Sequence, residues 1–313
     1  MIDGMPTVAV LMSTYNGEKY IRDQLDSIFS QENVSVKLIV RDDGSSDGTV
    51  GIVKEYVEKY PVELILDGEN VRPGESFMRL VYQSAEMPDV DYYAFADQDD
   101  IWLPDKLRTA VDAIAEGEAS IPTLYSSNQY IFVDGENRGL RHSEPQRTDL
   151  ISHMTKNTIA GCTFVFNKAL VRLVTETNRP DPRVIKSRLH DSWMMLVAIA
   201  CGRVIYDEQS RMLYRIHSEN VVGIKKISFV SRLKKLKRFF VKSEEANIRL
   251  ITAKELLRLF PQMGDDKKQI LKLYAEYQNS WKSKKALAFN KDIRENCTEN
   301  PIVFTLKVLT NFV

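Results

Sequence analysis

Residues 92–100 read YYAFADQDD, and the junction in this stretch between an apolar run and an acidic cluster decides the fold. Tyr92 to Ala96 is short, continuous and rich in β-forming residues, which predicts a buried strand. The acidic residues from Asp97 onward then lie at the carboxyl end of that strand, where open α/β sheets collect their ligands. If the backbone stays extended, Asp97 and Asp99 point to the same side.

The same arrangement of strand and polar loop occurs twice upstream. Residues 7–13 (TVAVLMS) predict a strand that ends in a polar loop, and residues 36–40 predict a second strand that ends in RDDGSSDG, residues 41–48. Amphipathic helices are expected in between, because apolar residues recur there at three- and four-residue intervals. The alternation predicts a mostly parallel sheet with helices on both faces. The other elements expected in this half are a strand at 62–66 and helices at 20–29, 49–60, 76–87 and from Pro104.

The regular alternation of expected strands and helices changes after residue 123. The expected elements are β-prone stretches at 124–133 and 159–166, a helix at 190–201, and short strands at 203–206 and 212–216 on either side of a turn. Farther on, residues 225–242 carry eight Lys or Arg, no acidic residue and an apolar stripe at helical spacing, which predicts an amphipathic basic helix. That helix either docks on an anionic membrane surface or packs against the rest of the chain.

The composition is that of an ordinary globular protein. Hydrophobic residues make up 43% of the 313 residues, and Lys plus Arg and Asp plus Glu both number 43, so no net charge draws the chain to nucleic acid. The three cysteines form no C-x-x-C pair, which favours a reducing compartment over zinc or redox chemistry. Neither a secretory signal nor an apolar run of ~18 residues is present, so we expect a cytoplasmic protein, in solution or peripheral on the inner face of the membrane.

Two acidic clusters are candidates for chemistry. The carboxylates of residues 97–100 repel one another, and a Mg²⁺ or Mn²⁺ ion carrying a diphosphate would offset that repulsion. Alternatively, Asp100 caps the helix that begins at Pro104. In the second cluster, Gly44 permits a tight turn, and the Asp43 carboxylate suits the ring N–H of uracil or thymine, with Tyr15 lying over the base. The alternative there is a polar loop without a ligand.

Together these motifs resemble the family 2 glycosyltransferases with the GT-A fold. The matching residues are MSTYN at 12–16, DDGSSDGT at 42–49, and DQDD at 97–100 followed by WLPDKL at 102–107. The resemblance covers residues 6–223 and is specific, because the motifs fall in the right order at the ends of consecutive strands. It implies a metal-dependent, inverting enzyme on a Rossmann-like, mostly parallel sheet with helices on both faces and a C-terminal helical extension.

The resemblance also implies roles for individual residues. Asp191 in HDSW, residues 190–193, would be the base that deprotonates the acceptor, although an Asp there is also a common helix cap. His217 in YRIHSEN, residues 214–220, would complete the metal site or touch the diphosphate, unless it is a surface histidine. The other implied contacts are the nucleobase for Ser13, Tyr15 and Asp43, the ribose for Asp97, Mn²⁺ or Mg²⁺ for Asp99, and the diphosphate for Arg72 and Arg215.

The resemblance divides the chain at residue 223. A GT-A catalytic domain would occupy 1–223, with a nucleotide-binding half at 6–115 and an acceptor half at 116–223, and a basic helical region would occupy 224–313. The motifs look most like those of rhamnosyltransferases of cell-wall or capsular polysaccharide assembly. This favours dTDP-rhamnose as the donor and a surface polysaccharide or lipid-linked glycan as the acceptor.

Three other functions are alternatives to this one. A UDP-hexose transferase of the same family stays open, and so does a non-catalytic, membrane-associated protein that binds nucleotide sugars. A sugar-1-phosphate nucleotidyltransferase fits less well, because it needs a Gly-rich, basic loop for a triphosphate. The loop at residues 14–17 has one Gly and no Arg.

Overall fold

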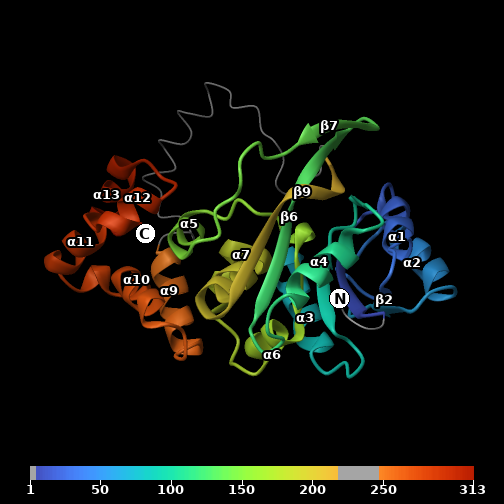
Figure 1. Cartoon of the computed structure of the whole chain (residues 1–313), viewed down its shortest axis with the longest axis horizontal. Helices are drawn as coiled ribbons and strands as arrows, with labels where there is room; N and C mark the ends of the chain where they lie inside the picture. Colours follow the sequence, from blue (N-terminus) through green and yellow to red (C-terminus); the bar gives the residue numbers. More distant parts are fainter. Residues whose placement is uncertain (1–4, 218–246) are drawn as a thin grey trace.

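The computed structural model describes residues 5–217 and 247–313, and within them the chain is built around a nine-stranded sheet (Figure 1). The strand order is β3-β2-β1-β4-β8-β6-β9-β5, and β7 pairs with β6 outside this path. The first four strands in this order are parallel, as the alternation of strands and helices predicts. Their bounds are Thr7–Thr14 for β1, Ser35–Asp42 for β2, Val62–Ile65 for β3 and Tyr92–Ala96 for β4.

The remaining strands make the sheet mixed. Strand β8 runs antiparallel to both β4 and β6, β9 runs parallel to β6, and β5 runs antiparallel to β9. Their bounds are Ile101–Trp102 for β5, Thr123–Val133 for β6, Glu136–Leu140 for β7, Val165–Asn167 for β8 and Arg203–Arg215 for β9.

Two of the strand assignments made from the sequence are wrong. The short strands expected at 203–206 and 212–216 are parts of the single strand β9, with no turn between them. The register between β9 and β6 shifts near Ser127, which accommodates the polar residues in the middle of β9 without ending the strand. The stretch 159–166 was expected to be one long strand, but it contains a 3-10 helix, η1, at Gly161–Thr163, and β8 begins only at Val165.

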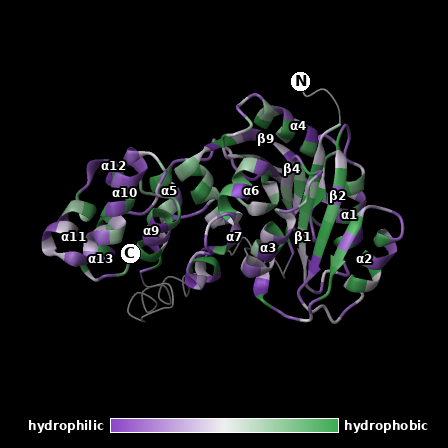
Figure 2. Cartoon of the chain, turned by 90° about the horizontal axis from the view of Figure 1, so that it is seen from below, coloured by the Kyte–Doolittle hydropathy of each residue, from purple (hydrophilic) through white to green (hydrophobic). Residues whose placement is uncertain are grey.

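Both faces of the sheet are apolar and covered by helices (Figure 2). Val8 and Val10 of β1 share a core with α1, α2 and α4, whereas Ala9 and Leu11 share a core with α3, α6 and α7. Successive side chains of a strand point to opposite faces, so a continuous apolar run is what a doubly covered strand requires. The α/β fold class with helices on both faces is therefore confirmed. The helices are α1 (Ile21–Phe29), α2 (Thr49–Val57), α3 (Arg72–Ser84), α4 (Lys106–Ala115), α6 (Lys168–Thr175) and α7 (Pro182–Cys201).

Helix α7 is broken in the middle. Leu189 has φ 64° and ψ 171°, so two helical segments meet at this residue. The second segment is the helix expected at 190–201, and it begins directly after the break. A non-glycine residue in such a conformation costs about 1–3 kcal/mol, so the packing around Leu189 must hold it there.

The C-terminal helices lie to one side of the sheet, beside α5 and α7 (Figures 1 and 2). The rings of Trp193 in α7 and Phe260 after α9 have centroids 6.1 Å apart, and the core that contains Ala9 continues into these helices. The basic helix expected at 225–242 and the expected boundary at residue 223 lie outside the described residues. The helices are α5 (Leu150–Thr155), α9 (Ile248–Leu259), α10 (Asp265–Glu276), α11 (Trp281–Ala288), α12 (Lys291–Asn296) and α13 (Pro301–Leu309).

Within the part of the chain that the structure describes, no helix combines the length and the apolar character that crossing a membrane requires.

Candidate active site

One large cavity, of about 1840 Å³, opens at the carboxyl ends of β1, β2 and β4. Its wall also includes the start of α3, the break in α7, the end of β9 and residues of the C-terminal helices. Eight of the nine candidate residues line it, namely Ser13, Tyr15, Asp43, Arg72, Asp97, Asp99, Asp191 and His217. Arg215 is absent from the described lining of this cavity.

The Asp43 carboxylate is held in a fixed position by three hydrogen bonds. Its Oδ1 accepts from Arg41 Nη1 at 2.6 Å and from the Val71 backbone N–H at 2.8 Å, and its Oδ2 accepts from the Arg72 backbone N–H at 2.8 Å. Arg41 is itself buried and also pairs with Asp67. A carboxylate has about four acceptor positions. Asp43 therefore keeps one position on Oδ2 for a ligand in the cavity.

The loop after β2 is shaped by Asp42 and Gly44. Asp42 Oδ1 accepts from the backbone N–H groups of Gly44 and Ser45, and Gly44 has φ +89°, as the sequence suggested for a tight turn. This turn aims Asp42 away from the cavity and leaves Asp43 facing it.

Ser13 near the end of β1, Tyr15 after it and Arg72 at the start of α3 line the same cavity as Asp43. Ser13 Oγ donates to Ser76 Oγ at 2.6 Å. The ring of Tyr15 is 51% exposed, while its backbone is fixed by two hydrogen bonds to the Gln98 side chain. Arg72 has φ 70°, a left-handed conformation that is held by the bond from its N–H to Asp43.

The acidic residues after β4 form a turn, so the expected extended geometry of Asp97 and Asp99 is wrong. The turn nevertheless leaves both side chains on the cavity wall. Burial, together with the nearby charges of Asp99 and Asp191, raises the pKa of Asp97 to about 7. Such mutual repulsion among carboxylates is what a bound cation relieves.

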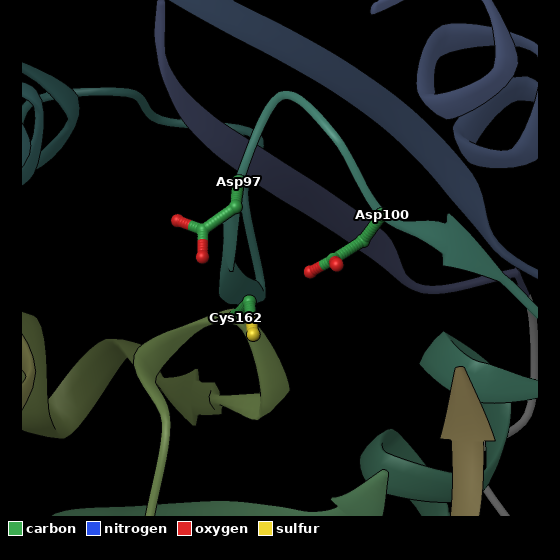
Figure 3. Close-up of side chains that lie close together, drawn as sticks. All are labelled: Asp97, Asp100 and Cys162. Carbon is green, nitrogen blue, oxygen red and sulfur yellow. The ribbon is translucent and has the colours of Figure 1, made fainter. Parts of the chain in front are cut away.

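Asp100 turns away from the cavity and into the protein. It is fully buried, its Oδ1 accepts from the Arg215 backbone N–H at 3.1 Å, and α4 is preceded by Asp105, so the expected helix cap by Asp100 is wrong. Figure 3 shows Asp100 close to Asp97 and to Cys162 of η1. Potential ligand atoms of these three residues lie within 4.8 Å of one another.

Lys106 bears on whether this buried cluster could bind a metal ion. It is fully buried, and burial lowers the pKa of Lys106 to about 8, against the opposing effects of Cys162 and Asp100. Burial also raises the pKa of the Cys162 thiol well above its usual value. A protonated thiol next to a lysine is a poor site for Mg²⁺ or Mn²⁺, which prefer oxygen ligands. We therefore interpret Asp100, Lys106 and Cys162 as the buried support of the acidic turn.

Asp99 and His217 lie together at the cavity and could hold a metal ion. His217 Nε2 lies 2.7 Å from Asp99 Oδ2, and the His217 ring lies against Tyr20 with centroids 4.7 Å apart. A carboxylate and an imidazole at the edge of the cavity, with Asp97 beside them, fit Mn²⁺ or Mg²⁺.

Arg215 supports the acidic turn from behind. Its Nε donates to the Asp99 carbonyl oxygen at 2.9 Å, and its Nη2 pairs with Asp23 at 2.8 Å. The Arg215 guanidinium thus contacts protein groups next to Asp99 and His217. We assign it a positioning role for the Asp99 backbone.

Asp191 lies at the start of the second segment of α7. Its Oδ2 accepts from Asn157 Nδ2 at 3.1 Å and its Oδ1 from the Ser192 backbone N–H at 2.6 Å. Burial raises the pKa of Asp191 to about 6, although these hydrogen bonds favour the ionised form. A carboxylate with a pKa near neutrality is suited to accept a proton.

The adjacent His190 is a residue of the core. His190 stacks on Phe77 with centroids 4.0 Å apart, and burial lowers the pKa of His190 to about 3. It is a neutral core residue that fixes the start of the helical segment. Asn157 and Arg41 also hold site residues, yet neither had a role assigned from the sequence, because their partners are brought to them only by the fold.

The fold and the cavity are those of an α/β enzyme, with carboxylates from several strand ends on the wall of one cavity. Residues 9–173 match the family model that is described as "Glycosyl transferase family 2". The chain is also 31% identical over 233 residues to the dTDP-rhamnosyl transferase RfbG of Shigella flexneri, covering 72% of this chain and 78% of that protein. The chain therefore belongs to glycosyl transferase family 2 and is an enzyme of that type.

Solved structures share the fold across nearly the whole chain. S. aureus TarS, residues 1–349, in complex with UDP-GlcNAc, has a TM-score of 0.57 and 18% identity, with 98% of this chain and 89% of that chain covered. The mannosyltransferase PcManGT from Pyrobaculum calidifontis, in complex with GDP-Man and Mn²⁺, has a TM-score of 0.50 and 16% identity, with 98% and 88% covered. At these identities the likeness concerns the fold.

Proposed function

We propose that the protein transfers rhamnose from dTDP-rhamnose to a surface polysaccharide or a lipid-linked glycan. The observation that carries this proposal is the convergence of Asp43, Asp99 and Asp191 on one cavity, although they come from three separate parts of the chain. The choice of donor is supported by the likeness to the Shigella flexneri dTDP-rhamnosyl transferase.

The donor end of the cavity is assigned to residues after β1, β2 and β4. Asp43 would accept the ring N–H of thymine, with Ser13 and the exposed ring of Tyr15 beside the base and Asp97 near the ribose. Arg72 would contact the diphosphate. A divalent cation held by Asp99 and His217 would neutralise the charge that develops on the departing diphosphate.

The acceptor is activated by Asp191. Its carboxylate takes the proton of an acceptor hydroxyl, and the oxygen attacks the anomeric carbon from the face opposite the leaving group. The bond from this carbon to the diphosphate oxygen breaks, the nucleoside diphosphate leaves, and the configuration at the carbon inverts. Asn157 and the Ser192 N–H orient the carboxylate for this step.

A thermal-shift panel of dTDP, UDP and GDP, each with and without Mn²⁺, tests the donor end. A ligand that binds the folded state raises the unfolding temperature. We expect the largest Mn²⁺-dependent shift with dTDP, and a smaller shift in Asp99→Asn. Equal shifts with all three nucleotides would contradict pyrimidine recognition by Asp43.

A second candidate is a UDP-hexose transferase, because TarS, which shares the fold, was solved in complex with UDP-GlcNAc. A larger shift with UDP than with dTDP would favour it. Nucleotide binding without turnover of either donor would instead indicate a non-catalytic binding protein.

A further inference from the structure

The cavity wall carries acidic side chains in one part only. Its acidic lining residues follow the strands or lie at the break of α7. The end formed by α5, α7 and the C-terminal helices is lined instead by Lys156, Arg188, Arg249 and Lys307, which we call the basic end. Among the lining residues described there, from Thr155, Lys156 and 248–313, none is acidic.

Arg188 is the central residue of the basic end. Its Nε donates to Thr252 Oγ1 at 2.8 Å, and its Nη1 and Nη2 donate to the carbonyl oxygens of His153 and Met154 at 3.2 and 2.8 Å. These three acceptors are neutral groups. A guanidinium has five N–H donors, so two are left for a ligand in the cavity.

The neighbours of Arg188 leave its charge without compensation. Arg249 pairs through both Nη atoms with Glu299, at 3.0 and 2.9 Å, and Lys307 pairs with the same carboxylate. Burial and the charge of Arg249 lower the pKa of Arg188 to about 9, which still leaves it protonated at neutral pH. Lys156 is exposed at the edge. Four cations therefore face one side-chain carboxylate, that of Glu299, among the residues described here.

We propose that the basic end binds a phosphate group of the acceptor. This inference rests on the proposed function, because it places the acceptor between the basic end and Asp191. A phosphate suits the site better than a single carboxylate, since it carries more charge and offers several oxygens to the remaining guanidinium donors. The acceptor is thus a phosphate-bearing glycan carrier, with the phosphate either a lipid-linked diphosphate or a phosphodiester of a polymer.

Thermal unfolding of the full chain in EDTA, titrated with inorganic pyrophosphate or with dimethyl phosphate, tests this site without a metal-bound donor. The variants are Arg188→Met, Arg188→Lys and Lys156→Met. Arg72→Met reports on pyrophosphate bound at the donor end, and Arg138→Met, an exposed arginine of β7 outside the cavity, is the matched control. We expect wild type and Arg138→Met to be stabilised alike. Arg188→Met should weaken the apparent affinity about tenfold, as the loss of a charge-assisted hydrogen bond implies, and Arg188→Lys should weaken it less.

The outcomes separate the possible sources of the phosphate. Stabilisation by pyrophosphate alone indicates a diphosphate carrier, whereas stabilisation by dimethyl phosphate as well indicates a phosphodiester polymer. Unchanged affinity in both Arg188→Met and Lys156→Met, or a loss confined to Arg72→Met, would overturn the proposal. Because Lys156 is exposed, its variant remains informative if Arg188→Met does not fold. Nucleotide and Mn²⁺ in parallel wells report separately on the donor site.

Discussion

At the scale of single residues, we predict that the protonation of Asp191, the proposed base, sets the lower pH limit of the transfer reaction. Since burial raises the pKa of Asp191 to about 6, the carboxylate that accepts the proton predominates above this pH and is lost below it. We expect the transfer rate to be level above about pH 6 and to fall roughly tenfold per pH unit below it. Initial rates between pH 5 and 8 measure this profile.

Replacement of the same residue gives an independent test. Asp191→Asn should abolish transfer, because an amide does not take up the proton, while nucleotide binding should stay nearly unchanged. The control is Asp134→Asn, an exposed turn residue with φ 52°, a conformation that Asn accepts. Full activity in Asp191→Asn would remove it as the base.

Lys106 offers a residue-scale prediction about stability. Lys106→Met removes a buried ammonium that donates to the Thr163 carbonyl oxygen and lies over the Trp102 ring, which should cost about 1–3 kcal/mol in the free energy of unfolding. The loss in the double variant Asp100→Asn/Lys106→Met should be smaller than the sum of the two single losses, because the two side chains interact in the buried cluster. Urea unfolding of the three variants measures the coupling, and strictly additive losses would show that the two residues do not interact.

The residues that line the cavity were predictable, but those that hold them were not. Asp43, Asp99 and Asp191 stand out in the sequence only because they belong to motifs that resemble those of one family, since an Asp at a helix start is also a common cap. Arg41 and Asn157 have side chains with many ordinary uses, and only the fold shows that each holds a site carboxylate. Their roles in binding and catalysis remain predictions.

At the scale of elements, η1 and α7 meet where Asp191 is placed. A Cβ at Gly161 would lie 2.8 Å from Asp191 Cβ and 3.1 Å from His190 Nε2. Gly161→Ala should therefore shift the start of the helical segment and lower kcat about 100-fold, as misplacement of a reacting group does. Nucleotide affinity should change little.

The matched control is Gly51→Ala in α2, where an added Cβ has nothing within 4 Å. This variant should keep full activity and gain up to about 1 kcal/mol of stability, because Ala is the better residue inside a helix. Steady-state kinetics measures kcat, and urea unfolding measures the stability, of both variants. Wild-type kcat in Gly161→Ala would show that η1 does not position Asp191.

Elements with one clear periodicity were predicted well, and β4 has the bounds expected from the sequence. Strand β9 was mistaken for two strands, because its polar middle resembles a turn. In the fold these polar groups have partners across the sheet, since Tyr125 donates to Asp207, and Ser210 accepts from the Tyr130 N–H. The break at Leu189 has no signal in the sequence, as leucine does not favour a positive φ.

At the scale of the whole molecule, the core of the sheet continues into the C-terminal helices. Phe260→Ala removes a fully buried ring that packs near Trp193 and should cost about 3–5 kcal/mol. The control Phe289→Ala removes a ring that is 60% exposed and should cost no more than about 0.5 kcal/mol. Because the core is shared, we expect one unfolding transition by circular dichroism and by tryptophan fluorescence. Two separate transitions would show that the helices fold on their own.

The sequence does not predict that the C-terminal helices line the cavity of the candidate active site. Their helical character follows from spacing, but Arg249 and Lys307 belong to no motif and reach the cavity only through packing. Long-range packing of this kind depends on side-chain shape across the whole core, which periodicity does not encode.

Under the proposed function, the break in α7 would also limit the size of the acceptor. Arg188 and Asp191 lie three residues apart on either side of Leu189, so the gap between the proposed phosphate anchor and the reacting hydroxyl would vary little. The helix would then fix this distance. Acceptors with too few or too many atoms between phosphate and hydroxyl would bind out of reach of the base, so that spacer length, and not sugar identity alone, would select the substrate.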